Sequence, residues 1–307
     1  MASENLKLPS YGGQALIEGV LMRGRRYAAA AMRAPDGQIV VDTEPLPPIF
    51  SSPVARIPFL RGLVMLWDAL GLGIRFLTRS ANVQTGEDEK IEGPALYLTL
   101  AASLAMMVLL FFIAPAALGR GLQTLIHLPP IWSHVFEGII RLAGIILYIW
   151  GIGKMPDIAR VFAYHGAEHK TINAFEAGAE LTPAVVSRYS LEHPRCGTAF
   201  LLTLMILSII LFAMLGDLPF LWLLLSRVVL IPVLAMLAYE YQRWTAAHVQ
   251  SPLVRFLVRP NLALQHLTTR EPTEEMIAVA IAAFNAMVAL EEVQVTEADL
   301  SIQPASP

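Results

Sequence analysis

Residues 94–118 read PALYLTLAASLAMMVLLFFIAPAAL, a stretch without a single charged side chain. An α-helix needs about 20 apolar residues to cross the hydrocarbon core of a bilayer, which is roughly 30 Å thick. Three later stretches, at residues 135–152, 199–215 and 218–239, are similarly apolar. The sequence therefore predicts a mainly α membrane protein whose central domain, residues 94–239, is a four-helix transmembrane bundle.

The composition of the whole chain agrees with this prediction. Of its 307 residues, 55% are hydrophobic and 15% are charged, whereas soluble domains contain about 25% charged residues. The formal net charge of −3 argues against a nucleic-acid partner, because nucleic-acid binders usually carry a basic excess. The single cysteine excludes an intrachain disulfide.

Lysine and arginine residues are unevenly distributed around the predicted spans. Ten precede the first span, one lies between the first and the second, five lie between the second and the third, and four follow the last. By the positive-inside rule, both termini and the connection at residues 153–198 are cytoplasmic. We therefore expect a multi-pass protein with the lipid bilayer as a partner.

The chain before the bundle has a different character. Residues 11–56 contain the turn sequence APDG at 34–37 between the β-prone stretches 27–33 and 38–42, which predicts a small cytoplasmic β-hairpin region. The glycine-dense part at 12–24 matches no phosphate-binding loop, and we expect it to form a loop and a strand.

Two further segments flank the bundle. Residues 57–80 form an apolar run whose charges share one helical stripe: Arg61, Asp68, Arg75 and Arg79. Such a stripe favours an amphipathic helix in the cytoplasmic interface over a fifth span. Residues 240–291 are expected to be a C-terminal cytoplasmic helical region, and residues 292–307 a disordered tail.

The densest group of reactive side chains lies in YHGAEHK at 164–170 and HPRCG at 193–197. His165 and His169 are four residues apart, so on a helix both imidazoles leave the same face and can chelate one ion. His193 and Cys196 form a second closely spaced pair, and imidazole and thiolate are typical zinc ligands. We predict that these four residues bind Zn²⁺ or a similar divalent transition metal. The simpler alternative is a polar helix face with solvated histidines.

A carboxylate lies between the two helical histidines. The order His165-x-x-Glu168-His169 is that of inverzincin proteases, in which the glutamate activates water. Glu168 is therefore the candidate catalytic base. Three other residues are candidates for a second shell that orients the metal ligands: Glu18, Asn173 and Glu176.

Three charged residues lie inside the predicted spans. Glu137 and Arg141 have the spacing of a favourable helical ion pair. Arg227 has no acidic residue within one helical turn, which leaves Glu137 as its cross-helix partner. For Glu137 and Arg141 we favour a self-neutralising structural pair close to the far interface over a polar pathway. A transporter, as a third function, would need discontinuous helices or intramembrane ion ligands, to which these three residues are the one pointer in the sequence.

Four motifs resemble those of the YqhQ-like family of bacterial membrane proteins: GGQALIEGVLMRG at 12–24, YHGAEHKTINAFE at 164–176, HPRCGT at 193–198 and LTTREPT at 267–273. The resemblance covers about residues 11–291. One departure is His266, where we would expect an arginine before LTTREP. The family is a domain of unknown function labelled as a predicted metal-dependent enzyme. The resemblance thus implies a bacterial plasma-membrane protein with a metal, and it supplies no substrate.

Two functions follow from these patterns. The first is a metal-dependent hydrolase, such as a peptidase, that acts on membrane-protein or lipid substrates at the cytoplasmic face. The second is a non-catalytic membrane scaffold or membrane-protein assembly factor, stapled by a closed four-ligand zinc site. Three protein ligands with an open position would favour the enzyme, and four ligands would favour the staple.

Overall fold

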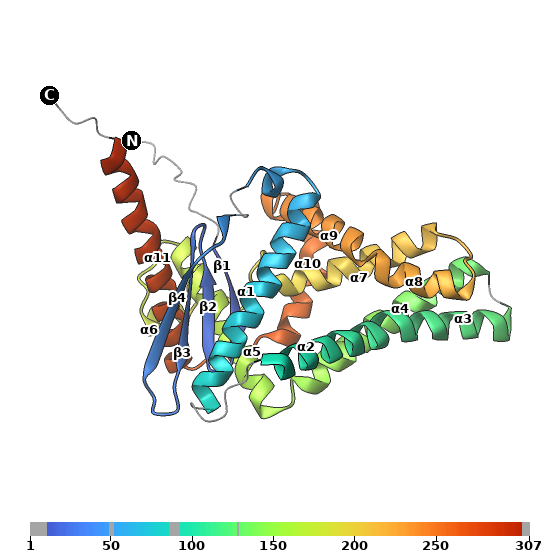
Figure 1. The fold of residues 1–307 in the computed structure, drawn as a ribbon, viewed down its shortest axis with the longest axis horizontal. Coiled ribbons are helices and arrows are strands. Elements are labelled where there is room, and N and C mark those ends of the chain that lie inside the picture. Colours follow the sequence, from blue (N-terminus) through green and yellow to red (C-terminus); the bar gives the residue numbers. More distant parts are fainter. Residues whose placement is uncertain (1–10, 49–51, 86–92, 128, 303–307) are drawn as a thin grey trace.

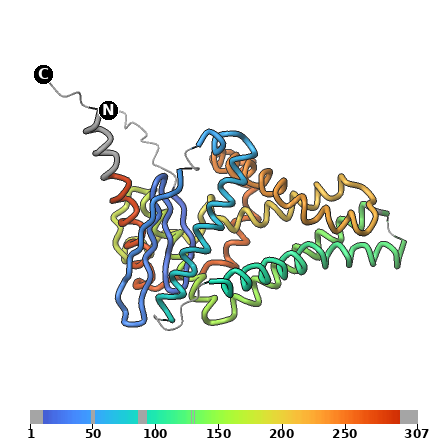
Figure 2. The backbone as a smooth tube through the Cα atoms, in the orientation of Figure 1, coloured from blue at the N-terminus to red at the C-terminus, as the bar shows by residue number. Residues whose placement is uncertain are grey.

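The computed structural model describes residues 11–48, 52–85, 93–127 and 129–302. In this part of the chain a small sheet with flanking helices forms one end of the molecule, and long helices extend away from it (Figures 1 and 2). The sheet end contains strands β1–β4 with helices α1, α5, α6 and α11. The long end contains the apolar helices. The structure is therefore mainly helical with one small antiparallel sheet, as predicted.

The sheet is larger than the predicted hairpin. Its four antiparallel strands lie in the order β1-β2-β3-β4, with the bounds β1 Gly12–Leu16, β2 Gly19–Arg23, β3 Tyr27–Arg33 and β4 Ile39–Pro45. Strands β3 and β4 are the predicted hairpin, and Gly37 in their turn has φ 86°. The glycine-dense stretch, which we expected to be a loop and a strand, forms the second hairpin. Its two-residue turn carries no glycine: Glu18 itself adopts φ 52°, so the usual turn signal is missing.

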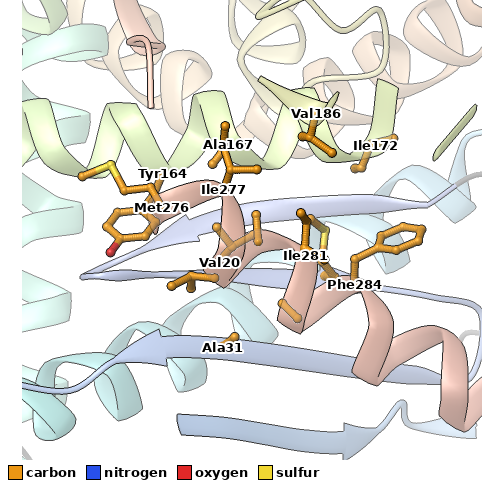
Figure 3. Close-up of a cluster of buried hydrophobic side chains, with 14 of the residues drawn as sticks. Val20, Ala31, Tyr164, Ala167, Ile172, Val186, Met276, Ile277, Ile281 and Phe284 are labelled. Carbon is orange, nitrogen blue, oxygen red and sulfur yellow. The ribbon is translucent and has the colours of Figure 1, made fainter. Parts of the chain in front are cut away.

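One face of the sheet packs against α5 (Pro156–Glu176) and α11 (Glu274–Ile302), and the short α6 (Pro183–Val186) packs on these two helices. Figure 3 shows Val20 and Ala31 of the sheet in the apolar core with Ile277 and Phe284 of α11 and Ala167 of α5. Because α5 is fixed by this core, the side chains on its other faces have defined positions.

Helix α11 has a capped start and continues further than predicted. The hydroxyl of Thr273 accepts a hydrogen bond from the backbone N–H of Met276 at 3.3 Å, which caps the first turn. The helix extends to Ile302, into the range 292–307 for which the sequence predicts disorder. No proline or glycine interrupts the segment before Pro304, and residues 303–307 lie outside the described ranges.

The other face of the sheet is covered by α1 (Leu60–Thr85), which follows the short 3₁₀ helix Pro53–Arg56. Leu72 and Phe76 of α1 are fully buried against the sheet. The charges of the predicted stripe are ion-paired: Asp68 with Arg23, Arg61 with Glu240, Arg75 with Glu44, and Arg79 with Asp42 and Glu44. These charged residues therefore attach α1 to the sheet and to the helix that carries Glu240.

Three helices of the described chain are long and apolar enough to cross a membrane, or four if one bent pair counts as a span. They are Gly93–Ile126, Ile131–Ile152, Gly197–Met214 and the pair Phe220–Val229 with Ile231–Ala247, which bends by 44°. They coincide with the four predicted stretches. The first is longer than predicted and consists of α2 (Gly93–Val108), a π-helical turn (Leu109–Ile113) and α3 (Ala114–Ile126).

The remaining long helices are α4 (Pro130–Ile152), α7 (Gly197–Met214), α8 (Phe220–Val229) and α9 (Ile231–Ala247), followed by α10 (Pro252–Thr268). The predicted connection at 153–198 contains α5 and α6 and ends at Cys196, directly before α7. The predicted region 240–291 contains α10, which packs on α7, and most of α11, which packs on the sheet. Helices of the segments 153–198 and 240–291 thus pack on one another and on α7, where the sheet end joins the long helices.

Candidate metal centre

Three of the four predicted metal ligands lie together. The ligand atoms of His165, His169 and Cys196 are all within 4.8 Å of one another. The two imidazole rings leave the same face of α5, with their centroids 4.4 Å apart. The sulfur of Cys196 lies 3.3 Å from Nε2 of His165. The arrangement joins the helix under the sheet to the first residue before α7.

Both histidines are oriented by backbone carbonyls. Nδ1 of His165 lies 2.9 Å from the carbonyl oxygen of Thr268, and Nδ1 of His169 makes a short hydrogen bond with the carbonyl oxygen of Leu191. A carbonyl can only accept, so each Nδ1 must carry a proton, and in the neutral imidazole each Nε2 then has a free lone pair. Metal-ligating histidines are usually held in this way by a second hydrogen bond.

The group fits a metal ion by a second criterion. Among the described residues, only two buried side-chain nitrogen or oxygen atoms lack a hydrogen-bond partner, Nε2 of His169 and Nε of Arg195. A buried polar atom without a partner costs roughly 1–3 kcal/mol. Nε2 of His169 faces the other ligand atoms, so a bound ion would satisfy it. Two imidazoles and a thiolate suit zinc or another first-row transition metal.

Cys196 occupies a position suited to a thiolate. It is the N-cap residue of α7, and its sulfur accepts a hydrogen bond from the backbone N–H of Thr198 at 3.5 Å. The N-terminus of a helix favours negative charge. The side chain is buried, and the amide of Gln242 donates to its backbone carbonyl at 2.9 Å, which fixes the cap to α9.

Glu168 lies beside both histidines. One of its carboxylate oxygens is 3.5 Å from Nε2 of His169 and 4.0 Å from Nε2 of His165. The side chain is buried and rests on β1: a Cβ atom added to Gly13 would lie 2.6 Å from Cγ of Glu168. Gly13 therefore makes room for this carboxylate, whereas the space around Gly12 is open.

The structure does not include His193 in the ligand group. Its ring is buried with its centroid 5.7 Å from that of His169, and its Nε2 lies 3.9 Å from Glu176 and 3.4 Å from Arg195. Glu176 is ion-paired with Arg195. Burial alone would raise the pKa of the Glu176 carboxyl, but His193 and Arg195 bring it below its ordinary value. His193 thus takes part in a polar group next to the site.

Asn173 supports the site through the backbone. Its amide donates to the carbonyl oxygens of Ser190 at 2.9 Å and Glu192 at 3.0 Å, on either side of Leu191. Leu191 is the residue whose carbonyl orients His169. Asn173 therefore holds the backbone on either side of the carbonyl that orients His169, and its second-shell role stays a prediction.

Glu18 lies further from the site. Both of its carboxylate oxygens are bonded by Arg160, at 2.5 and 2.6 Å, and one also accepts from the hydroxyl of Tyr164 at 3.2 Å. The Arg160 hydrogen bond holds the pKa of Glu18 below its ordinary value. Burial, with Glu18 beside it, raises the pKa of Tyr164 to about 12. Glu18 thus attaches the first hairpin to the turn of α5 that precedes His165.

Several supporting residues were not predicted. The buried Lys170 donates to the carbonyls of Ser187 and Tyr189 and is ion-paired with Glu271. Gln265 bonds both the N–H and the carbonyl of His193. Thr268 and Gly166 belong to the motifs quoted above, but their roles depend on contacts between distant parts of the chain. The carbonyl of Thr268 orients His165, and a Cβ on Gly166 would lie 2.2 Å from the carbonyl oxygen of Arg270.

Fold and site together define a class: a mainly helical protein with several apolar helices that could cross a membrane and a His/His/Cys group that could hold a metal ion. The chain belongs to the family described as a protein of unknown function (DUF1385), whose model matches residues 57–290. It is 34% identical to the uncharacterized protein YqhQ of Bacillus subtilis (strain 168) over 301 residues, which cover 92% of this chain and 93% of that protein. The resemblance to YqhQ-like proteins is confirmed. No solved structure is significantly similar to the chain.

Proposed function

We propose that this protein is a metal-dependent hydrolase of the bacterial plasma membrane. His165, His169 and Cys196 would hold Zn²⁺ or a similar divalent ion, and Glu168 would act as the general base. The observation that carries the proposal is the position of the Glu168 carboxylate, 3.5 and 4.0 Å from the two histidine nitrogens of a three-residue ligand group. Three protein ligands with a neighbouring carboxylate are typical of catalytic zinc sites.

The residues of the chain divide the work as follows. The two histidines and Cys196 hold the ion, which when bound supplies a Lewis acid that acidifies water. The carboxylate of Glu168 would accept a proton from a water molecule held at the group, because one of its oxygens lies 3.5 Å from Nε2 of His169. Gly13 and the buried surroundings fix the direction of the carboxylate.

The location follows from the charge distribution. The sheet end, α5 and the ligand group lie in segments rich in lysine and arginine, which by the positive-inside rule supports a cytoplasmic position for them and for both termini. The ligand group lies at the junction of the sheet end with the long helices. Substrates would then be membrane proteins or lipids cleaved near the cytoplasmic surface.

Metal analysis of the purified chain tests the ligand group. We expect about one equivalent of zinc or a similar ion in the native chain and none after combined replacement His165→Ala and His169→Ala. His248→Ala is the matched control, because His248 is exposed and bonded to the carbonyl of Trp244. An unchanged metal content in the double variant would remove the site.

The substitution Glu168→Gln tests catalysis separately from metal binding. It keeps the shape of the side chain and removes the proton acceptor. In a bacterium whose own gene for this protein is deleted, we expect uncleaved membrane lipids or peptides to accumulate. Expression of the native chain should remove them, as measured by mass spectrometry. The Glu168→Gln chain should carry its metal and leave those species in place. Full complementation by this variant would exclude the catalytic role.

A structural zinc staple is the second candidate function. The ligands come from α5, which packs on the sheet, and from the start of α7 in the bundle, so a bound ion would join the two ends of the molecule. His193 would have to turn towards the ion as the fourth ligand. X-ray absorption of the zinc-loaded chain distinguishes the candidates: an oxygen neighbour supports the enzyme, and three imidazoles with one sulfur support the staple.

A further inference from the structure

Helix α1 has an apolar surface that no described part of the chain covers. Along the side opposite its buried residues, exposed large side chains follow at steps of seven, three, four and three: Leu60, Trp67, Leu70, Ile74 and Leu77. Trp67 is 77% exposed. We call these five residues the α1 stripe. Steps of three, four and seven place them on one helical face.

The charges of α1 are kept away from this stripe. They lie on the flank of the helix that faces the sheet, and each has an ion-pair partner on the sheet or on α9. A helix whose opposite face is entirely apolar gains from burying that face. Contiguous exposed apolar surface of this kind marks an interaction site.

The position of α1 indicates what covers the stripe. The helix begins at the end of the last apolar pair, where a Cβ on Gly62 would lie 3.0 Å from Cβ of Tyr239 and where Arg61 pairs with Glu240. From there it runs across the ends of the long helices, between them and the sheet (Figure 1). Since the sheet covers the opposite side of α1, the stripe faces away from the sheet and stays exposed.

The tryptophans of the long helices lie at both ends of the bundle. All five tryptophans of the chain are exposed. Trp132 and Trp222 lie near the starts of α4 and α8, at one end of the bundle, and Trp150 and Trp244 lie near the ends of α4 and α9, at the other. Exposed tryptophans at both ends of apolar helices form the aromatic belts of membrane proteins.

A basic side chain supports the assignment of this second belt. The ammonium group of the exposed Lys154, just beyond α4, lies 3.4 Å from the centre of the Trp150 ring. Lysine and tryptophan together are typical of the headgroup level. Trp67 of the α1 stripe belongs to the helix that starts at this same end of the bundle.

We propose that the α1 stripe is embedded in the phospholipid bilayer, in the leaflet on the side of the sheet. The occupant of the stripe is lipid because the stripe is an exposed apolar helix face that carries a tryptophan, and its helix packs on α9, at the end of the bundle where Trp150, Trp244 and Lys154 lie. Embedding α1 holds the sheet against the bilayer surface, a role that does not depend on a metal.

Fluorescence quenching of single-tryptophan chains tests this proposal. In full-length protein in nanodiscs of phosphatidylcholine and phosphatidylglycerol, Trp132, Trp150, Trp222 and Trp244 are replaced by Phe, which leaves Trp67. The probe is phosphatidylcholine brominated near the top of its acyl chains. We expect this lipid to quench Trp67 as strongly as it quenches a chain that retains only Trp150.

The matched control is Val41→Trp in a chain with all five native tryptophans replaced by Phe. Val41 is exposed on β4, on the opposite sheet face from the Asp42 and Glu44 side chains that pair with α1. Aqueous iodide should quench the tryptophan introduced in this control and leave Trp67 bright. Quenching of Trp67 by iodide would show that water covers the stripe, and quenching by neither agent would show that protein covers it; either result overturns the proposal.

Discussion

Two buried polar groups of this protein differ in how completely their atoms are paired. At the metal centre Nε2 of His169 is buried without a hydrogen-bond partner, and so is Nε of the nearby Arg195. In the bundle, Glu137 is bonded by Arg141 and by Arg227, with Nε of Arg227 2.7 Å from a Glu137 oxygen. The first group is incomplete without a further atom, whereas the second is complete by itself.

The completeness of the bundle group extends to every guanidinium nitrogen. Arg141 also donates to the carbonyl of Phe111 and to Ser208, both at 2.7 Å. Arg227 also donates to Ser226 and to Nδ1 of His134. Each guanidinium nitrogen thus already has a partner within the protein, which is the pattern of a structural cluster, and the bend between α8 and α9 is the one transporter-like feature of these helices in the described chain. The comparison shows that a structural charged cluster and a candidate binding site differ in one property: whether their buried polar atoms all have hydrogen-bond partners within the protein.

The largest expected effect comes from opening the complete group. Glu137→Ala leaves two fully buried arginines without their shared partner, and breaking such a buried pair costs roughly 3–5 kcal/mol. We expect the free energy of unfolding in detergent to fall accordingly, while the metal content of the folded fraction stays the same. A drop in metal content would show that the two groups are coupled.

The next effect comes from emptying the incomplete group. If the site binds metal, a free ion at 100 times its dissociation constant stabilises the native chain by about 2.7 kcal/mol. A chelator should remove this stabilisation. Thermal unfolding with and without the chelator measures this difference. The chain with His165→Ala and His169→Ala should show none, and an equal chelator effect in both chains would contradict the contrast.

A smaller effect is expected from Gly13→Ala. The added methyl group overlaps the Glu168 side chain, and overpacking of this kind costs roughly 1–3 kcal/mol. The metal should remain, because no ligand atom is touched. Gly12→Ala, where nothing lies within 4 Å, is the control in the same strand. Similar unfolding curves for the two variants would show that the contact between Gly13 and Glu168 is loose.

The smallest effect concerns acid. The Arg160 hydrogen bond lowers the pKa of Glu18 from its ordinary value of 4.5. Its stabilisation is therefore complete above that value and is lost as the pH falls through the lower folded-state pKa. Because Arg160 is about half exposed, we expect less than about 1 kcal/mol. In the Glu18→Gln chain the melting temperature should depend less on pH below about pH 5 than in the native chain. The same pH dependence in both chains would contradict the role of the Glu18–Arg160 pair.

The sequence predicts those features that depend on local periodicity. The four apolar stretches, the β3–β4 hairpin and the pairing of Glu137 with Arg141 all follow from spacing and residue type. The first hairpin does not, because Glu18 takes a backbone conformation that usually indicates glycine. The separation of His193 from the other ligands also depends on distant residues: Gln265 fixes its backbone, and Glu176 with Arg195 lies beside its ring.

The π-helical turn at Leu109–Ile113 adds one residue to the first long apolar helix. In a π-turn each N–H reaches one residue further back than in an α-helix, so the segment holds one residue more than a regular helix would. The N–H of Ala114 bonds to the carbonyl of Leu109, and the carbonyl of Phe111 within the turn is the one that accepts from Arg141. Deleting a single residue here would restore a regular helix and rotate the part before the turn by about 100° relative to the part after it. The extra residue therefore sets which side the first half of this helix turns towards its neighbours, next to the point where the buried Arg141 of α4 donates to its backbone.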